Sequence, residues 1–160
     1  MSGVQMMLVL GAMILLSMVV LTINRAKLFS EQQISQSEYT IAATSVGQGL
    51  LNEISSKSFD AATVSKPDAE VSTFTAPGSL GRNSSEIYPN FNDVDDYHRF
   101  SRTYSTPRAG DFNVTASVHY INTSQPNTPV NYRTRTKRVT VVVSSPFMEQ
   151  PVTLFHYFSH

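Results

Sequence analysis

The 160-residue chain contains no cysteine and no tryptophan, and it has only seven glycines. Without cysteine, disulfide bonds, thiolate zinc sites and thiol catalysis are excluded. Twelve basic and twelve acidic residues give a net charge of zero, so bulk charge favours neither nucleic acid nor an acidic partner. Charged residues make up only 15% of the chain, and serine, threonine and asparagine are frequent from residue 30 onward. This polar but weakly charged composition suits an extracellular surface.

Charge is also missing from a run of residues near the N-terminus, 4–23. Twenty helical residues extend about 30 Å, which is the hydrocarbon thickness of a bilayer. A cleavable signal peptide would begin with a basic region, contain a shorter apolar core and end at small residues. The run has none of these features. It is therefore predicted to be a helix that lipid or other protein chains bury.

The first basic residues, Arg25 and Lys27, follow the apolar run. Basic flanks face the cytoplasm, so an ordinary signal anchor would leave the rest of the chain there. That orientation conflicts with the extracellular style of the remainder. The conflict disappears if a basic leader upstream of Met1 has been removed, and we expect this to be the case.

The helix signal continues beyond the apolar run. No proline occurs before Pro67, and no glycine lies between Gly11 and Gly47. One helix over residues 1–58 is the simplest prediction, and two helices with a break near Asn24 or Gly47 are the alternative. In the C-terminal half of this predicted helix, apolar residues recur at helical spacing and form one stripe. They are Tyr39, Ala43, Val46, Leu50 and Ile54.

The period of apolar residues changes in the C-terminal part. Residues 59–96 are rich in proline, glycine, serine and asparagine and read as a connecting loop. Apolar and polar residues then alternate in the segments 111–121, 136–145 and 151–159, and more weakly in 97–104. This pattern predicts an antiparallel sheet of three or four strands. Val139, Val141 and Val143 share one face of their strand.

One face of such a sheet needs a cover, and the helical stripe supplies it. The predicted fold class is therefore α+β. A long N-terminal helix has an apolar membrane or filament-core half, 1–24, and an amphipathic half, 25–58. The amphipathic half packs on the C-terminal sheet, 97–160.

Two stretches, "MSGVQMMLVLGAMILLS" and "DDYHRFS…TKRVTVVVSS", carry a resemblance to a known family. Together with the layout of the whole chain, they resemble the type IV pilin and type II secretion pseudopilin superfamily. The resemblance implies a basic leader that a prepilin peptidase removes and an N-methylated first residue. Met1 is then the processing site, and a first mature residue at Val4 is the alternative.

The same resemblance implies a structural subunit of a type IV pilus-like extracellular helical filament. The apolar half-helix would lie in the inner membrane before the pilus assembly machinery transfers it into a filament of identical subunits. Neither nucleic acid nor a catalytic role is expected. The residues implied to form the filament core are Met1, Val4, Gln5, Leu8, Gly11, Ala12, Leu15, Leu16, Val19 and Val20.

Gln5 departs from the family pattern, because many members have a glutamate at the fifth mature residue. Thr22 also stands near a position where many pilins have a proline. A neutral amide is less costly than a carboxylate in an apolar core, but it offers no Coulomb attraction. The Gln5 departure favours a second function, a minor pseudopilin of a secretion or DNA-uptake machine. A signal-anchored extracytoplasmic binding domain is the alternative from another class.

Three acids in "NFNDVDDYH", Asp93, Asp95 and Asp96, are candidate ligands for Ca²⁺, which binds six to eight oxygens. The spacing lacks the glycine and the closing glutamate of an EF-hand, so solvated loop acids and a turn cap are the alternative. No other cofactor is expected. His156, on an alternating strand, is predicted to be half-buried, and the four histidines have no helical metal spacing.

Arg133, Arg135 and Lys137 share one face at period two. They are predicted to form a charged row on a strand edge, which either discourages edge pairing or contacts a neighbouring subunit. Sequons for glycosylation occur at three asparagines: Asn83, Asn113 and Asn122.

Overall fold

The computed structural model of the chain describes residues 2–160. Its first element, α1, is one uninterrupted helix over Gly3–Ser55. The described helix therefore has no break near Asn24 or Gly47. The prediction of a single long N-terminal helix is confirmed, and the helix ends at Ser55 rather than at residue 58.

The chain forms two compact units, and the second of these covers Tyr39–His160. This unit contains the last part of α1 and the whole sheet. One face of the helix is buried there through Ala43, Leu50 and Ile54, together with Leu51. The predicted amphipathic stripe thus covers the sheet, because residues three and four positions apart lie on one face of a helix.

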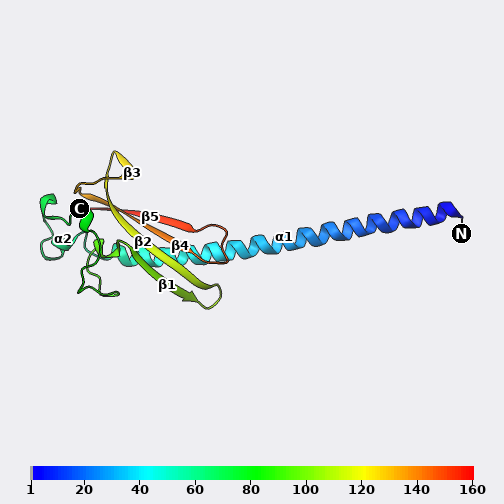
Figure 1. Cartoon of the computed structure of the whole chain (residues 1–160), viewed down its shortest axis with the longest axis horizontal. Coiled ribbons are helices and arrows are strands. Elements are labelled where there is room, and N and C mark those ends of the chain that lie inside the picture. The colour runs from blue at the N-terminus through cyan, green and yellow to red at the C-terminus, as the bar shows by residue number, and fades with distance from the viewer. Residues whose placement is uncertain (1) are drawn as a thin grey trace. The chain divides into compact units, whose positions relative to one another are not determined.

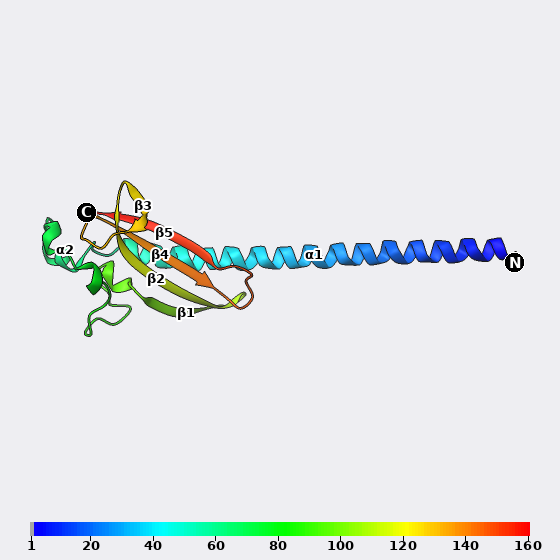
Figure 2. The same ribbon diagram turned by 45° about the horizontal axis from the view of Figure 1, so that its top comes forward.

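The sheet is antiparallel, and its strand order is β1-β2-β4-β5, with β3 paired to the end of β2 (Figure 1). Figure 2 shows the same strands beside the last part of α1. The sequence predicts three or four strands, and the additional one, β3, is short and fully exposed, so it has no apolar alternation. The five strands are β1 (Phe100–Thr106), β2 (Gly110–Asn122), β3 (Gln125–Pro129), β4 (Thr136–Ser144) and β5 (Val152–Ser159).

Alternation along β2 and β4 directs every second side chain into the core, as predicted. The first strand begins at Phe100 rather than at residue 97, because Tyr97 belongs to a short 3-10 turn. His156 is exposed rather than half-buried, because β5 forms the edge of the sheet and is only partly covered.

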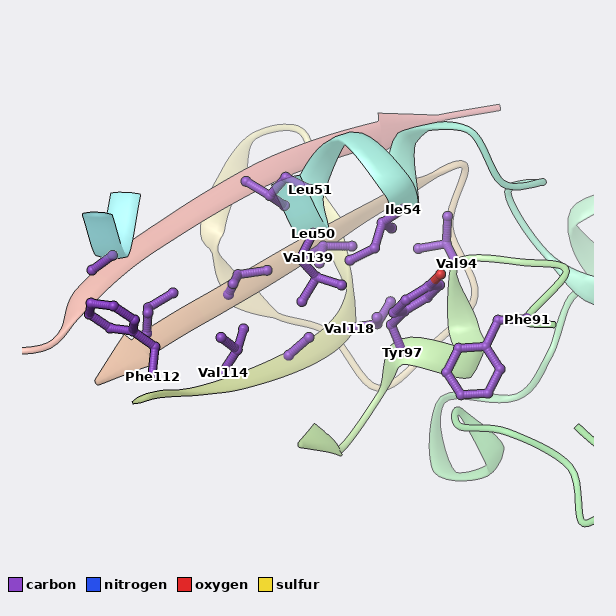
Figure 3. Close-up of a cluster of buried hydrophobic side chains, with 14 residues drawn as sticks. Leu50, Leu51, Ile54, Phe91, Val94, Tyr97, Phe112, Val114, Val118 and Val139 are labelled. Atoms are coloured by element: carbon purple, nitrogen blue, oxygen red, sulfur yellow. The ribbon is translucent and has the colours of Figure 1, made fainter. Parts of the chain in front are cut away.

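The core lies between α1 and the sheet (Figure 3). Leu50 and Ile54 of α1 contribute from one side, and the inward residues of β2 and β4 contribute from the other. Tyr97 and Phe91 extend this core into the connection that precedes β1, where their rings meet edge to face at a centroid distance of 5.0 Å.

The connection over residues 59–96 contains four short helices: α2 (Ala61–Ser65), η1 (Val71–Thr73), η2 (Pro77–Ser79) and η3 (Asp95–Tyr97). Its two ends lie side by side, because Ser58 accepts a hydrogen bond from the Val94 N–H at 2.9 Å and donates its own N–H to Asn92 at 3.2 Å. The residues that follow Ser58 are therefore close to those that follow Asn92.

Candidate functional site

Residues 4–23 of α1, here called the apolar segment, are exposed. An 18-residue window of this helix has a mean hydropathy of 2.7, and none of the window is buried. Leu8 and Leu16, for example, expose 68% and 65% of their surface. A continuous apolar surface of this kind is unfavourable in water. By length and composition, this helix could cross a membrane.

The residues implied to form the filament core lie on this exposed surface, except Met1, which is outside the described residues. Gly11 has open space beside it, since no atom outside the adjoining helix backbone lies within 4 Å of the place where a Cβ would be. Gly11 and the neighbouring Ala12 have small side chains, so the backbone of a second helix can approach α1 closely at this point.

Polar side chains in the apolar segment are bonded within the helix itself. The hydroxyl of Ser17 donates to the carbonyl of Met13 at 2.8 Å, and the hydroxyl of Thr22 donates to that of Met18 at 2.8 Å. Neither hydroxyl proton needs water or a neighbouring chain as an acceptor. The segment can therefore enter lipid or a protein core without leaving these donors unpaired.

Gln5 has a local role at the start of α1. Its Oε1 accepts the backbone N–H of Ser2 at 3.1 Å, and the carbonyl of Ser2 accepts the N–H of Gln5 at 3.0 Å. This is the half of a capping box in which the third helical residue reaches back to the cap. A neutral amide is sufficient for this bond.

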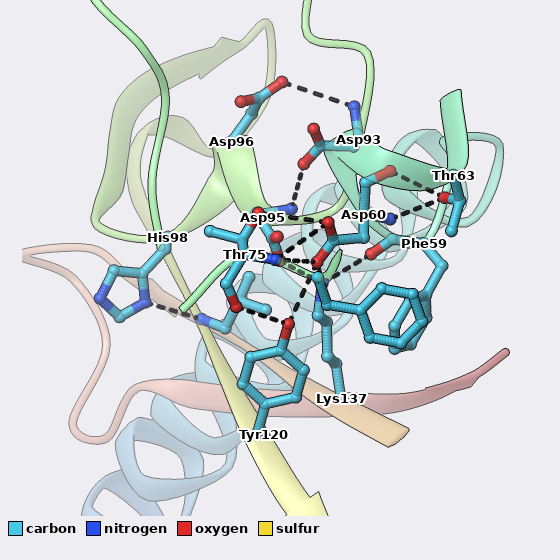
Figure 4. A network of polar contacts seen from close by, with 12 residues as sticks. Phe59, Asp60, Thr63, Thr75, Asp93, Asp95, Asp96, His98, Tyr120 and Lys137 are labelled. Carbon is cyan, nitrogen blue, oxygen red and sulfur yellow. Dashed lines mark hydrogen bonds and ion pairs between the residues drawn. The ribbon is translucent and has the colours of Figure 1, made fainter. Parts of the chain in front are cut away.

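A second feature lies within the folded unit that contains the sheet. It is a buried ionic cluster of Lys137, Asp60 and Asp95 (Figure 4). Lys137 is fully buried. Its Nζ lies 2.7 Å from Oδ2 of Asp60 and 2.7 Å from Oδ1 of Asp95, and it donates to the Phe59 carbonyl at 2.9 Å. The contacts of the ammonium group with Phe59 and Asp60 are hydrogen bonds, and its contact with Asp95 is an ion pair.

Asp60 is the more completely bonded of the two acids. Its carboxylate accepts N–H bonds from Ala62 and Thr75 and hydroxyl bonds from Thr75 and Tyr120. Burial alone would raise the pKa of Asp60, but the hydrogen bond and charge of Lys137 and the backbone donors lower it to about 2. Asp60 is therefore held as a carboxylate at neutral pH.

Asp95 is bonded differently. Its Oδ1 forms the ion pair with Lys137, but both of its oxygens are buried and have no hydrogen-bond partner among the described residues. Burial raises the pKa of Asp95 to about 7, against the opposing charge of Lys137. Burial therefore favours the protonated form of Asp95, whereas Asp60 is favoured as a carboxylate.

Asp93 and Asp96 shape the loop that carries Asp95. Asp93 Oδ1 accepts the Asp95 N–H at 2.7 Å, and Asp96 Oδ2 accepts the Asn92 N–H at 3.0 Å. The sequence raises the alternative of solvated acids, which is wrong, because all three are at most 3% exposed. Within residues 2–160, no group of three or more acids and histidines is arranged to hold a metal ion.

The inward position of Lys137 corrects the predicted charged row. Arg133 and Arg135 precede β4 and are exposed, whereas Lys137 shares the inner face with Val139 and Val141. Extending the alternation of the valines back by two residues would have found it. The charge of Lys137 is typical of an exposed residue, but the alternation of buried and exposed residues along β4 places Lys137 on the buried face.

A separate polar cluster joins the end of α1 to the aspartate loop. The Glu53 carboxylate accepts hydroxyl bonds from Tyr97 at 2.7 Å and from Tyr88 at 3.0 Å. Burial and the bond to Glu53 raise the pKa of Tyr97 well above its usual range. These bonds help to fix the loop that positions Asp95.

The candidate glycosylation sites are all exposed. Asn83 lies in the connection, Asn113 lies within β2 between two neighbouring strands, and Asn122 ends that strand. The side chain of Asn122 already bonds Tyr132 at 3.4 Å and the Ser124 N–H at 3.0 Å. Asn83 is therefore the least constrained of the three.

The whole chain matches no protein-family model, no curated protein and no solved structure. Function is therefore argued from the residues and their geometry.

Proposed function

We propose that the chain is a structural subunit of a type IV pilus-like extracellular filament. The observation that carries the proposal is the exposed apolar segment, which continues into a helix whose later part covers a folded sheet. Such a chain has a folded part that is stable in water and a helical part that is not. Assembly of many copies through residues 4–23 buries the second part.

Two properties of the apolar segment support transfer between lipid and a protein core. The hydroxyls of Ser17 and Thr22 donate within the helix, so the change of surroundings leaves neither donor unpaired. Apolar burial is similar in lipid and in a protein core, so close packing must favour the filament. Gly11 and Ala12 permit that close approach.

The inner membrane holds the subunit before assembly in this proposal, and the folded unit faces the outside of the cell. A minor pseudopilin shares this mechanism and differs in its place in the assembly. A chain that stays in the membrane as a monomer would instead be a signal-anchored binding domain.

The test is a charge placed in the apolar segment. Met13→Asp and Leu16→Asp should abolish filaments, because each buries an unpaired carboxylate in the assembly. Leu16→Met, which nearly conserves volume, is the matched control and should leave filaments intact. Near-UV circular dichroism should show the folded unit unchanged in all three variants. Filaments formed by both aspartate variants would refute the assembly role.

Gln5→Glu tests what surrounds position 5 in the assembly. The variant keeps the bond to Ser2 at the helix start, since a carboxylate also accepts an N–H. A higher filament yield indicates a cation close to this position, and a lower yield indicates a site built for an amide.

A further inference from the structure

The buried ionic cluster encloses a primary amine between two carboxyl groups. Lys137 Nζ lies 2.7 Å from an oxygen of Asp60 and 2.7 Å from an oxygen of Asp95. Phe59 and Tyr120 place their rings against the amine, with centroids 4.3 Å and 4.9 Å from Nζ. All three charged side chains are at most 3% exposed. The amine and both acids are therefore held together in a compartment that excludes bulk water.

The two acids have unequal chemistry. Both carboxylate oxygens of Asp60 accept hydrogen bonds. The donors include the N–H of Ala62 and the N–H and hydroxyl of Thr75, and these bonds favour the ionised form of Asp60. Neither oxygen of Asp95 has a hydrogen-bond partner in the described chain, and only Oδ1 has an ion pair. An unpartnered oxygen is costly on a buried carboxylate and less so on a neutral carboxylic acid. Asp60 is thus the carboxylate that lies in position to take a proton from Lys137, and Asp95, the less bonded acid, is suited to be an electrophile.

We infer that the folded chain joins Lys137 to Asp95 through an intramolecular amide bond, with Asp60 as the base. The bond would link β4 to the loop at η3, two parts of the chain that lie far apart in sequence. This modification site is independent of the proposed function, because a single folded chain contains all of its parts.

The reaction begins with a proton transfer. The Lys137 ammonium gives one proton to Oδ2 of Asp60, and the freed amine bonds to the carboxyl carbon of protonated Asp95. The carbon–oxygen bond to Oδ2 of Asp95 then breaks. That oxygen leaves as water with its own proton and a second proton from the amine. The products are one amide, one water molecule and a protonated Asp60, and no oxidant or cofactor is consumed.

Two physical effects favour this condensation inside the cluster. Reacting groups held in contact behave as one molecule, so the entropy of bringing them together is already spent in folding. The reaction also replaces the buried charges of Lys137 and Asp60 with neutral groups, which a compartment lined by Phe59 and Phe74 favours. In addition, the Asp95 oxygen that departs, Oδ2, is the one that has neither a hydrogen bond nor an ion pair.

Intact-mass spectrometry of the full chain tests the inference. The protein is purified in detergent, kept folded at neutral pH and then unfolded. The wild-type chain should be lighter than its sequence by one water molecule, and digestion should give one branched peptide that joins Lys137 to Asp95. Lys137→Arg, Asp95→Ala and Asp60→Asn should each restore the full mass. Lys66→Arg, at an exposed lysine, should keep the loss.

A wild-type chain of full sequence mass overturns the inference, whether or not any variant folds. So does a water loss that persists in Lys137→Arg or that hydroxylamine reverses, since a succinimide would explain it. A branched peptide that joins Lys137 to Asp60 would contradict the roles assigned to the two acids. None of these readouts depends on filament formation.

Discussion

At the residue scale, as long as no amide joins Lys137 to Asp95, the charge of Lys137 stabilises two buried acids that come from opposite ends of one loop. Replacing it with methionine would leave Asp60 and Asp95 without their cation. Removing one partner of a buried ionic group typically costs about 3 to 5 kcal/mol. We therefore expect Lys137→Met to lower the free energy of unfolding by about that amount, measured by denaturant titration of the full chain in mild detergent.

Arg135→Met is the matched control for this prediction, because Arg135 is exposed and lies two residues away. It should change stability by less than about 0.5 kcal/mol, as is usual for surface substitutions. Equal stability of the two variants would show that the cluster around Lys137 contributes little to the fold.

Asp93 gives the folded unit a dependence on pH. Burial, followed by the charge of Asp96, raises the pKa of Asp93 to about 6. Between about pH 4 and pH 6, the folded state keeps a proton that the unfolded state has lost, so Asp93 lowers stability as pH rises through that window. Asp93→Asn cannot ionise and still accepts the Asp95 N–H, so it should gain up to about 3 kcal/mol over the wild type across the window.

The measurement is the free energy of unfolding of both proteins at pH 4, 5, 6 and 7, with Asp68→Asn, an exposed acid, as the control. The control should follow the wild-type curve. A constant difference between Asp93→Asn and the wild type at all four values would contradict the assigned titration.

Single residues also show which features of the fold can be predicted from the sequence and which cannot. The inward valines of β4 are predictable from alternation, and Lys137 follows from the same period once its charge is set aside. Its partner Asp60 is 77 positions away, in the cap of α2, and no local pattern connects the two. The three acids of the loop look solvated in sequence, because no local pattern shows that the loop packs against a distant residue such as Lys137 of β4.

At the scale of elements, α1 lies close to the sheet at Gly47. A Cβ at this position would lie 2.7 Å from Cδ1 of Leu154 and 3.1 Å from Cγ2 of Val143. Alanine is favoured over glycine in a helix by about 1 kcal/mol, but overpacking typically costs about 1 to 3 kcal/mol. Gly47→Ala should therefore be less stable than Gly49→Ala, at whose Cβ position the space is open, by about 1 to 2 kcal/mol.

Thermal or denaturant unfolding of these two variants decides the point, since both make the same chemical change in one helix. Gly49→Ala should equal or exceed the wild type. If Gly47→Ala is the more stable of the two, α1 does not approach the sheet as closely as described.

The sequence predicts best those helices and strands in which apolar residues repeat at regular spacing. The stripe of α1 and the alternation of β2 and β4 arise from burial of one face, which leaves a repeating signal. The strand β3 has the sequence "QPNTP" and no buried residue, so it has no such signal. The short helices of the connection depend on caps such as Asp60 and on contacts from distant segments.

At the scale of the whole molecule, the apolar segment should determine solubility and association. A chain that begins at residue 30 lacks that segment and retains the whole of the second compact unit. It should be monomeric in aqueous buffer without detergent, whereas the full chain should need detergent or assembly. Light scattering coupled to size-exclusion chromatography measures this. A truncated chain that still forms large assemblies would place the association surface in the sheet.

The most direct test of the central claim is negative-stain electron microscopy of material sheared from cells that produce the full chain, with an antibody against residues 39–160 as the label. The account predicts labelled helical filaments composed of this chain. A chain found only as an unassembled monomer in the membrane fraction, with no labelled filament, would contradict it.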